Sequence, residues 1–158
     1  MLAVTRSRAA ALLDDTSRAI IAELQQDGRR AYSTIGKSVG LSEAAVRSRV
    51  QRLTESGILQ VVGVTDPLQL GFARQAMLGI RVAGDVEPVA DRLSTLEDVD
   101  YVVVTAGSFD LLVEVVCRDD DHLLDVVNRQ IRAMPDVLSA EIFRYLKLAT
   151  QTYAWGVS

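Results

Sequence analysis

The 158-residue sequence predicts an α+β protein with an N-terminal winged helix-turn-helix domain and a C-terminal ferredoxin-like βαββαβ domain. The apolar residues follow the helical period of about 3.6 as far as Ile58 and a strand-like period of two from Leu59 onward. The charge changes in the same region, because residues 1–65 carry a net +3 and residues 66–158 a net -7. Such an asymmetry within one chain predicts two domains with different partners, the basic one facing a polyanion.

Four segments follow from these changes of pattern. They are a flexible N-terminal arm at residues 1–12, a helix-turn-helix domain at residues 13–62, a linker at residues 63–74, and a ferredoxin-like domain at residues 75–158. The linker is placed where Pro67 and Gly71 break regular structure. Hydrophobic residues make up 49% of the chain, which suffices for buried cores without disulfides. Near the C-terminus, Tyr153 and Trp155 are expected to anchor the tail or an interface.

Three helices are expected in the helix-turn-helix domain, each with an apolar stripe at helical spacing. The stripes are Leu13, Ile20, Ile21 and Leu24; Ile35 and Val39; and Val46, Val50 and Leu53. Asp27 and Gly28 end the first helix, and Ser33 can cap the second. Gly40 and Ser42 then supply a turn and an N-cap for the third helix, and two short helices joined in this way form a helix-turn-helix.

Strand patterns dominate the remainder of the chain. Residues 59–66, LQVVGVTD, are typical of a short strand or wing. The elements expected after the linker are strands at residues 75–82, 99–105, 111–117 and 137–148, a helix opened by Pro88, and a helix at residues 120–134. The last helix should turn Leu124, Val127, Ile131 and Met134 inward. The order βαββαβ predicts an antiparallel sheet with both helices on one face, and the other face is apolar enough to require a partner sheet.

Cations are concentrated on the third helix and the segment before it. Residues 28–52 hold six cations and one anion, Glu43, which gives +5 in a protein whose net charge is -4. The strip opposite the apolar stripe consists of Ala44, Ser48, Gln51 and Glu55. Small side chains let the front of a helix enter a major groove, while the flanking Arg47 and Arg52 can reach phosphates. Merely solvated arginines are the ordinary alternative, but the local excess of charge favours binding of double-stranded DNA.

The residues expected to contact DNA surround this outer strip. They are Ser42, Glu43, Ala44, Arg47, Ser48, Arg49, Gln51 and Arg52. Ser48 and Gln51 are candidates for contacts with base edges. Arg49 lies beside the apolar stripe, at an angle suited to a backbone phosphate or to an ion pair with the first helix.

The segment TAGSFD at residues 105–110 joins two strong strands. Gly107 and Ser108 predict a tight hairpin in which glycine adopts the positive φ that such turns require. Asp110 either satisfies amides of the turn, which is the more common role, or binds the ammonium group of a ligand whose carboxylate meets the loop amides. The residues of this expected effector site are Ala106, Gly107, Ser108, Phe109 and Asp110.

The other reactive residues predict neither a metal site nor a cofactor. One cysteine, Cys117, and one histidine, His122, cannot form an intrachain disulfide or a zinc cluster. Three aspartates beside His122 indicate the start of a helix. A general base paired with a nucleophile is missing, so no enzyme activity is expected. The absence of a membrane-length apolar run and of a signal segment predicts a cytoplasmic protein.

Three stretches together resemble the Lrp/AsnC, or feast/famine, family of transcription regulators. They are LDDTSRAIIAELQQDGRRAYSTIGKSVGLSEAAVRSRVQRLTESGIL from Leu13, TDPLQLGF from Thr65 and TAGSFDLLVEV from Thr105. The resemblance covers nearly the whole chain, from Leu13 to Leu148. It implies a helix-turn-helix that reads operator DNA and a ferredoxin-like domain that forms dimers and often larger rings. It also implies small effectors, commonly amino acids, bound between subunits near the glycine-containing hairpin.

By position, the resemblance places DNA contacts in residues 42–52 and the effector loop in residues 106–110. Two departures from the family pattern concern the ligand and the first helix. The last strand has Ala140 and Ile142 where many members bear two threonines, and the first helix has Ser17 where the family often has aspartate. The missing hydroxyl groups weaken the case for a standard amino acid as the effector.

The sequence thus predicts a sequence-specific DNA-binding transcription regulator whose operator binding or assembly responds to a small effector, an amino acid or related metabolite. Expected partners are double-stranded DNA, the effector, and further copies of the chain in a homodimer or a higher oligomer such as an octamer. The alternative is a small-molecule-sensing module that acts through protein partners, which leaves the cationic segment without a role. The target genes, the sign of regulation, the effector and the ring size do not follow from the sequence.

Overall fold

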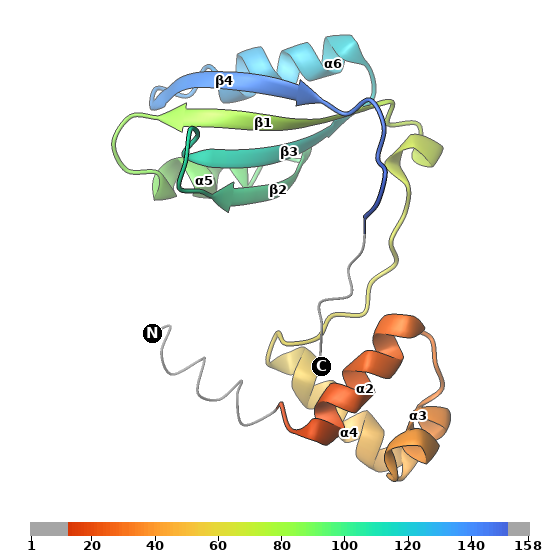
Figure 1. Ribbon diagram of the computed structural model, residues 1–158. Helices are drawn as coiled ribbons and strands as arrows, with labels where there is room; N and C mark the ends of the chain where they lie inside the picture. Colours follow the sequence, from red (N-terminus) through yellow and green to blue (C-terminus); the bar gives the residue numbers. More distant parts are fainter. Residues whose placement is uncertain (1–12, 152–158) are drawn as a thin grey trace. The chain divides into compact units, whose positions relative to one another are not determined.

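The computed structural model describes residues 13–151, which form two compact units (Figure 1). The first unit runs to Val64, and the second spans Thr65–Thr150. Each unit has its own apolar core. The arm expected at residues 1–12 and the aromatic residues Tyr153 and Trp155 lie outside the described residues.

The first unit contains three helices, α2 (Asp15–Gln26), α3 (Tyr32–Val39) and α4 (Glu43–Glu55). Their apolar stripes meet in one core, whose most deeply buried side chains are Ile20, Ile35, Val46 and Leu53. The carboxylate of Asp14 caps α2 by accepting a hydrogen bond of 2.7 Å from the backbone N–H of Ser17. The hydroxyl of Ser42 caps α4 by accepting one of 3.2 Å from Ala45. The three predicted helices and the predicted N-cap at Ser42 are confirmed.

The turn between α3 and α4 depends on two glycines. Gly40 adopts the left-handed conformation, with φ of 70°, at the end of α3. Gly36 lies against the turn so closely that a Cβ atom there would stand 2.5 Å from the carbonyl oxygen of Leu41. The N-cap predicted at Ser33 is wrong, because α3 begins at Tyr32 and Ala31 occupies the capping position without a side-chain hydrogen bond. The Tyr32 side chain, at the first position of the helix, packs against the core.

The strand or wing predicted at residues 59–66 is not formed. Leu59 packs into the core, but Val61, Val62 and Val64 are 53%, 67% and 62% exposed. The valines have the spacing of a strand, yet a strand requires a hydrogen-bonded partner, and no segment of the described chain pairs with them. The first unit is therefore a three-helix helix-turn-helix domain in which this segment is extended and unpaired.

The second unit has the predicted order βαββαβ. Its strands are β1 (Arg74–Val82), β2 (Val99–Val104), β3 (Leu111–Cys117) and β4 (Val137–Arg144). Its helices are α5 (Glu87–Leu93) and α6 (Asp120–Asp125), and α6 continues as the π-helix η2 (Val126–Ile131). A short 3-10 helix, η1 (Pro67–Leu70), precedes β1. The strands form one antiparallel sheet in the order β2-β3-β1-β4. Both helices cover the same face of this sheet, and their buried residues share one apolar cluster with it (Figure 1).

Of the four residues predicted to point inward from the second helix of this unit, Val127, Ile131 and Met134 are buried and Leu124 is not. Leu124, expected to point inward, is 51% exposed, whereas Leu123 is buried. The cause is the π turn, in which the backbone N–H of Arg132 donates to the carbonyl of Val127 at 2.8 Å. A π turn accommodates an additional residue, so the residues before it are rotated relative to a regular helix. Strand β4 also ends at Arg144 rather than Leu148, because β1 offers no partner beyond its first residues.

The face of the sheet opposite the helices is called the open face below. Its residues are Met77, Gly79 and Arg81 of β1, Tyr101 and Val103 of β2, Leu112 and Glu114 of β3, and Ser139, Glu141 and Phe143 of β4. Tyr101 is 49% and Phe143 42% exposed. Large aromatic side chains in contact with water on one sheet face indicate a surface that binds a partner.

Candidate functional site

The first candidate site is the outer surface of α4. Val46, Val50 and Leu53 turn into the core, so the opposite side of the helix faces water. The side chains exposed on that side are Ser42, Glu43, Ala44, Arg47, Ser48, Gln51, Arg52 and Glu55. The structure thus brings together all the sequence-predicted DNA-contacting residues except Arg49 on one exposed strip. The small Ala44 and Ser48 leave that strip narrow, as predicted.

Arg49 is engaged within the unit. Its Nη1 lies 2.7 Å and 2.9 Å from the two carboxylate oxygens of Asp14 and 3.1 Å from the hydroxyl of Ser17. The hydrogen bond from Arg49, followed by those from Ser17, lowers the pKa of Asp14 to about 2. Of the two roles considered for Arg49, the structure shows the ion pair with the first helix. Ser17, which stands where the family often has aspartate, is buried beside this pair.

Arg47 is held on two sides. Its Nη2 donates to Oε1 of Glu43 at 2.9 Å, and its guanidinium lies 5.4 Å from the centre of the Tyr32 ring. On the same side of α4, Nε2 of Gln51 donates to Oε1 of Glu55 at 2.8 Å. Sequence reasoning did not anticipate Tyr32, because a contact between the start of α3 and the middle of α4 depends on how the two helices cross.

Arg52 and Lys37 differ from the two arginines just described. Neither makes an ion pair or side-chain hydrogen bond within the described chain. Both side chains are exposed. They are therefore available to an anionic partner without first giving up an internal contact.

The second candidate site was predicted in the loop between β2 and β3. The loop is closed by a hydrogen bond of 2.9 Å from the backbone N–H of Thr105 to the carbonyl of Asp110, and the Thr105 hydroxyl donates to the carbonyl of Phe109 at 2.7 Å. Gly107 does not have the predicted positive φ, and no atom beyond its chain neighbours lies near the position of a Cβ. A loop of this length reverses the chain without a left-handed residue, unlike a two-residue turn.

Asp110 is used by the fold. Its Oδ2 accepts a hydrogen bond of 2.8 Å from the backbone N–H of Val82, and its own N–H donates to the carbonyl of Ile80 at 2.9 Å. The carboxylate therefore satisfies a backbone amide, as the more common of the two predicted roles requires. The amide belongs to β1, however, and not to the turn itself.

Phe109 leaves the loop and packs on the open face. Its ring meets Phe143 edge to face, with 5.8 Å between centres and an interplanar angle of 76°. Gly79 makes room for this ring, because a Cβ atom there would lie 2.7 Å from three of its carbon atoms. A glycine inside a strand is the signal that could have revealed this close approach.

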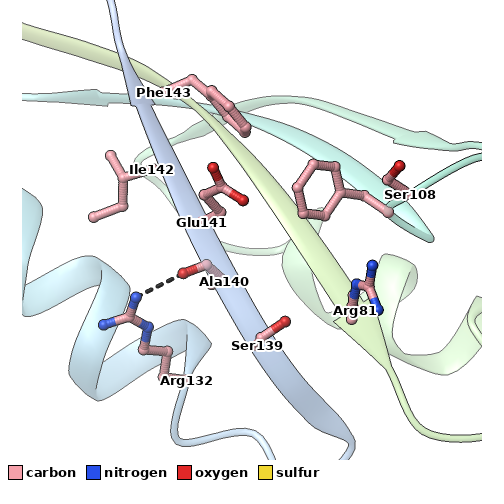
Figure 2. A pocket seen from close by; sticks show the side chains of 9 residues that line it. Arg81, Ser108, Arg132, Ser139, Ala140, Glu141, Ile142 and Phe143 are labelled. Atoms are coloured by element: carbon pink, nitrogen blue, oxygen red, sulfur yellow. Dashed lines mark hydrogen bonds between the residues drawn. The ribbon is translucent and has the colours of Figure 1, made fainter.

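An open groove of about 910 Å³ follows the edge strand β4 (Figure 2). Its lining residues are Arg81, Ser108, Phe109, Arg132 and residues 139–143. Ser108 and Phe109 are the predicted effector residues that reach it, whereas Ala106, Gly107 and Asp110 do not line it. Sequence reasoning missed Arg81, Arg132 and Glu141. They come from elements that are far apart in the sequence, and only the folded structure brings them to one groove.

The two sides of β4 have different surroundings. Figure 2 shows Glu141 and Phe143 on one side and Arg132 and Ile142 on the other. Ala140 and Ile142 pack against the core under the helices. Arg132 reaches from the end of the second helix to the strand, where its Nη2 donates to the carbonyl of Ala140 at 2.6 Å.

The lone histidine and cysteine have structural surroundings. Nδ1 of His122 accepts a hydrogen bond from the backbone N–H of Arg118 at 3.2 Å, and Nε2 lies 3.2 Å from Oδ2 of Asp98. Asp119 caps the helix, and the helix start predicted at the three aspartates is confirmed. Cys117 is buried, and burial, followed by the charges of Asp98 and Asp119, raises the pKa of its thiol to about 11. Within the described residues, no group of three or more His, Cys, Asp or Glu side chains is placed to hold a metal ion.

The helices of the described chain are too short or too polar to cross a membrane. A helix-turn-helix in which α4 exposes a narrow strip flanked by Arg47 and Arg52, followed in the same chain by a βαββαβ unit with one open sheet face, defines a class of transcription regulators. Within that class, the chain belongs to the Lrp/AsnC family. Residues 13–54 match the AsnC-type helix-turn-helix domain, and residues 72–158 match the PF0864 C-terminal dimeric alpha+beta barrel domain.

Known proteins agree with this assignment over nearly the whole chain. An uncharacterised HTH-type transcriptional regulator of Pyrococcus abyssi is 30% identical over 99% of this chain and 97% of its own length. The structure of AsnC from E. coli superposes with a TM-score of 0.79 at 25% identity, covering 89% of this chain and 97% of that one. The feast or famine regulatory protein from M. tuberculosis complexed with L-methionine gives a TM-score of 0.81 at 27% identity, covering 90% and 98%.

Proposed function

We propose that this regulator binds double-stranded DNA through α4, as a homodimer, and that a small effector with the chemistry of an amino acid modulates its binding or assembly. The observation that carries the proposal is the exposed strip of α4. It combines small side chains at the front with Arg47 and Arg52 at the flanks. Such a protein would act in the cytoplasm, and no catalytic role is proposed for it.

The individual residues of α4 have different tasks in this proposal. Arg52, which has no internal partner in the described chain, contacts a phosphate, and Lys37 at the end of α3 can contact another. Ser48 and Gln51 face base edges in the major groove. Arg49 is a positioning residue, because its contacts with Asp14 and Ser17 fix the orientation of α4 on α2.

The open face supports the proposed dimer. Tyr101, Phe143 and Met77 lie on a sheet face that no helix of the described chain covers, and burying such a face against a second copy removes apolar surface from water. Twofold symmetry also suits paired half-sites on DNA. The family match to a dimeric domain is consistent with this arrangement. A larger closed assembly such as an octamer is part of the same proposal.

The groove along β4 is the proposed effector site. Arg81 and Glu141 lie on adjacent strands of the open face, and neither makes a side-chain ion pair within residues 13–151. An α-amino acid carries a carboxylate for the arginine and an ammonium group for the glutamate. The relative from M. tuberculosis was solved with L-methionine, which supports this class of ligand.

A gel shift tests the DNA-binding proposal. The probe is the DNA directly upstream of the protein's own gene, compared with a scrambled duplex of equal length and composition. We expect retention of the upstream probe and weaker retention of the scrambled one. Equal failure on both probes at low salt would reject DNA binding and favour the alternative, a sensing module that acts through protein partners.

A thermal-shift screen tests the effector proposal separately. Amino acids and oxo-acids are added to the full chain, and the best ligand is then tested on Arg81→Gln and Glu141→Gln. We expect an amino acid to raise the melting temperature and either substitution to abolish the rise. A ligand that stabilises all three proteins equally binds elsewhere.

A further inference from the structure

The first two turns of α4 contain a paired acid and base on the side proposed to face DNA. Glu43 is the first residue of the helix, and Arg47 is one turn further along, with 2.9 Å between Oε1 and Nη2. Their side chains are 52% and 64% exposed. The central carbon of the guanidinium also lies over the Tyr32 ring, at 5.4 Å from the ring centre.

A carboxylate at this position opposes DNA affinity. The backbone phosphates of DNA are anions, so an acid on the approaching surface repels them. The pair itself adds little to the stability of the fold, because both side chains are largely in water. Glu43 also meets the positive end of the helix dipole, which is the ordinary reason for an acid in a first turn. An interaction with the helix dipole does not require the Glu43 side chain to be hydrogen-bonded to Arg47, one turn further along α4.

We infer that Glu43 and Arg47 together read one G·C base pair in the major groove, and that Glu43 is a specificity-determining residue. The inference rests on the proposed binding of DNA through α4. Guanine presents two acceptors, O6 and N7, to which an arginine donates, and cytosine presents the N4 amino group, from which a carboxylate accepts. The hydrogen-bonded Glu43–Arg47 pair presents a set of donors beside an acceptor, and a G·C pair presents two acceptors beside a donor. An A·T pair offers no two adjacent acceptors to the arginine.

The neighbouring residues support this role. The first turns of a recognition helix are the part that contacts base edges. In those turns, the Ser42 hydroxyl is already used by the backbone N–H of Ala45, and Ala44 has no polar group. Besides Ser48, Glu43 and Arg47 are therefore the exposed polar groups available there. Tyr32 acts as a positioning residue, since its ring restricts the guanidinium without using any of the N–H donors of Arg47.

The test uses the full chain and its variant Glu43→Gln in selection of sites from a random duplex library. Affinities are then measured for the selected site, for the same site with the G·C pair replaced by A·T, and for scrambled DNA. We expect the parent to select half-sites with a G·C pair at one fixed position. The variant should discriminate G·C from A·T at that position on the order of 10-fold less well, and it should bind scrambled DNA more tightly, because one anion is removed.

Glu55→Gln is the matched control. It removes the same charge from a second exposed pair on α4, in which Glu55 is bonded to Gln51. It should raise affinity for scrambled DNA without changing the preference at that position. Arg47→Lys keeps the charge but loses the planar donor pair, and should lose the preference as Glu43→Gln does.

Two results would overturn the inference in distinguishable ways. If Glu43→Gln keeps the parent's preference while the parent still selects a site, the pair is only a surface contact. If the parent selects no site at all, the proposed DNA-binding function fails, and the role of Glu43 fails with it. Because Glu43, Arg47 and Glu55 lie outside the core, circular dichroism spectra should be the same for all four proteins. Melting temperatures should differ only by the small contributions of a surface ion pair and the helix dipole.

Discussion

The contact between Gly79 and Phe109 makes a strong prediction about the second unit. A methyl group on residue 79 would stand 2.7 Å from three ring carbons of Phe109, including the one nearest the backbone. The ring must therefore retreat by roughly 0.7 Å to reach the 3.4 Å at which ordinary contacts begin. Because the root of the ring is involved, rotation of its far end does not relieve the clash.

We expect Gly79→Ala to lower the free energy of unfolding of this unit by about 1–3 kcal/mol, the usual cost of overpacking. Part of this destabilisation comes from disturbing the edge-to-face contact of Phe109 with Phe143, which is worth about 0.5–1.5 kcal/mol. The assay is urea denaturation of the parent, Gly79→Ala, Phe109→Ala and the double variant. In the Phe109→Ala background the ring is absent, so Gly79→Ala should cost close to nothing.

Gly107→Ala is the control for a general effect of losing glycine. Gly107 has open space around it and no left-handed backbone, so this substitution should leave stability within about 0.5 kcal/mol of the parent. The reasoning is refuted if Gly79→Ala costs the same with and without the Phe109 ring. The same set can be assayed for the effector response, which should decline with Phe109→Ala because Phe109 lines the groove.

Three further predictions concern other parts of the chain. Arg52→Ala should lower the slope of log affinity against log salt by about one per subunit, measured by fluorescence anisotropy on operator DNA, and an unchanged slope would remove Arg52 from the phosphate contacts. The carboxyl pKa of Asp14 falls from 3.8 to about 2 on folding, so its stabilising effect is present above pH 3.8 and is lost as the pH falls through about 2. Between pH 3.8 and about 2, the melting temperature should therefore fall less for Asp14→Asn than for the parent. Parallel curves would contradict the stabilising role of the ionised Asp14 carboxylate. Light scattering at micromolar concentration should give at least a dimer for the parent and a smaller particle for Phe143→Asp, which places a charge on the open face; a monomeric parent would reject the dimer.

The elements of the fold followed from local patterns, but their details depended on contacts between distant residues. Strand β3 was predicted with its observed bounds, because its alternate residues face the core and strands of this kind carry a strong signal. Leu124 was misplaced because a π turn leaves no mark in the apolar spacing. The predicted conformation of Gly107 was wrong because loop length, not the presence of glycine, decides the backbone of a connection.

The candidate sites differ in how far the sequence could define them. The exposed strip of α4 is local, so its members could be identified from helical spacing alone. The restraint of Arg47 by Tyr32 and of Arg49 by Asp14 could not, because it depends on the crossing of three helices. The groove along β4 could not be predicted either, since only the register of β1 with β4 places Arg81 and Glu141 on the same face of adjacent strands.

The bond from Arg132 to the carbonyl of Ala140 has a consequence for how the protein can aggregate. Strand β4 is at the edge of the sheet, and an uncovered edge carbonyl is a template on which another strand can be added without limit. A guanidinium over that carbonyl, with the charges of Glu141 and Arg144 nearby, opposes such addition. Edge-to-edge growth into fibres is thereby disfavoured relative to the proposed dimer, in which copies of the chain meet through the open face.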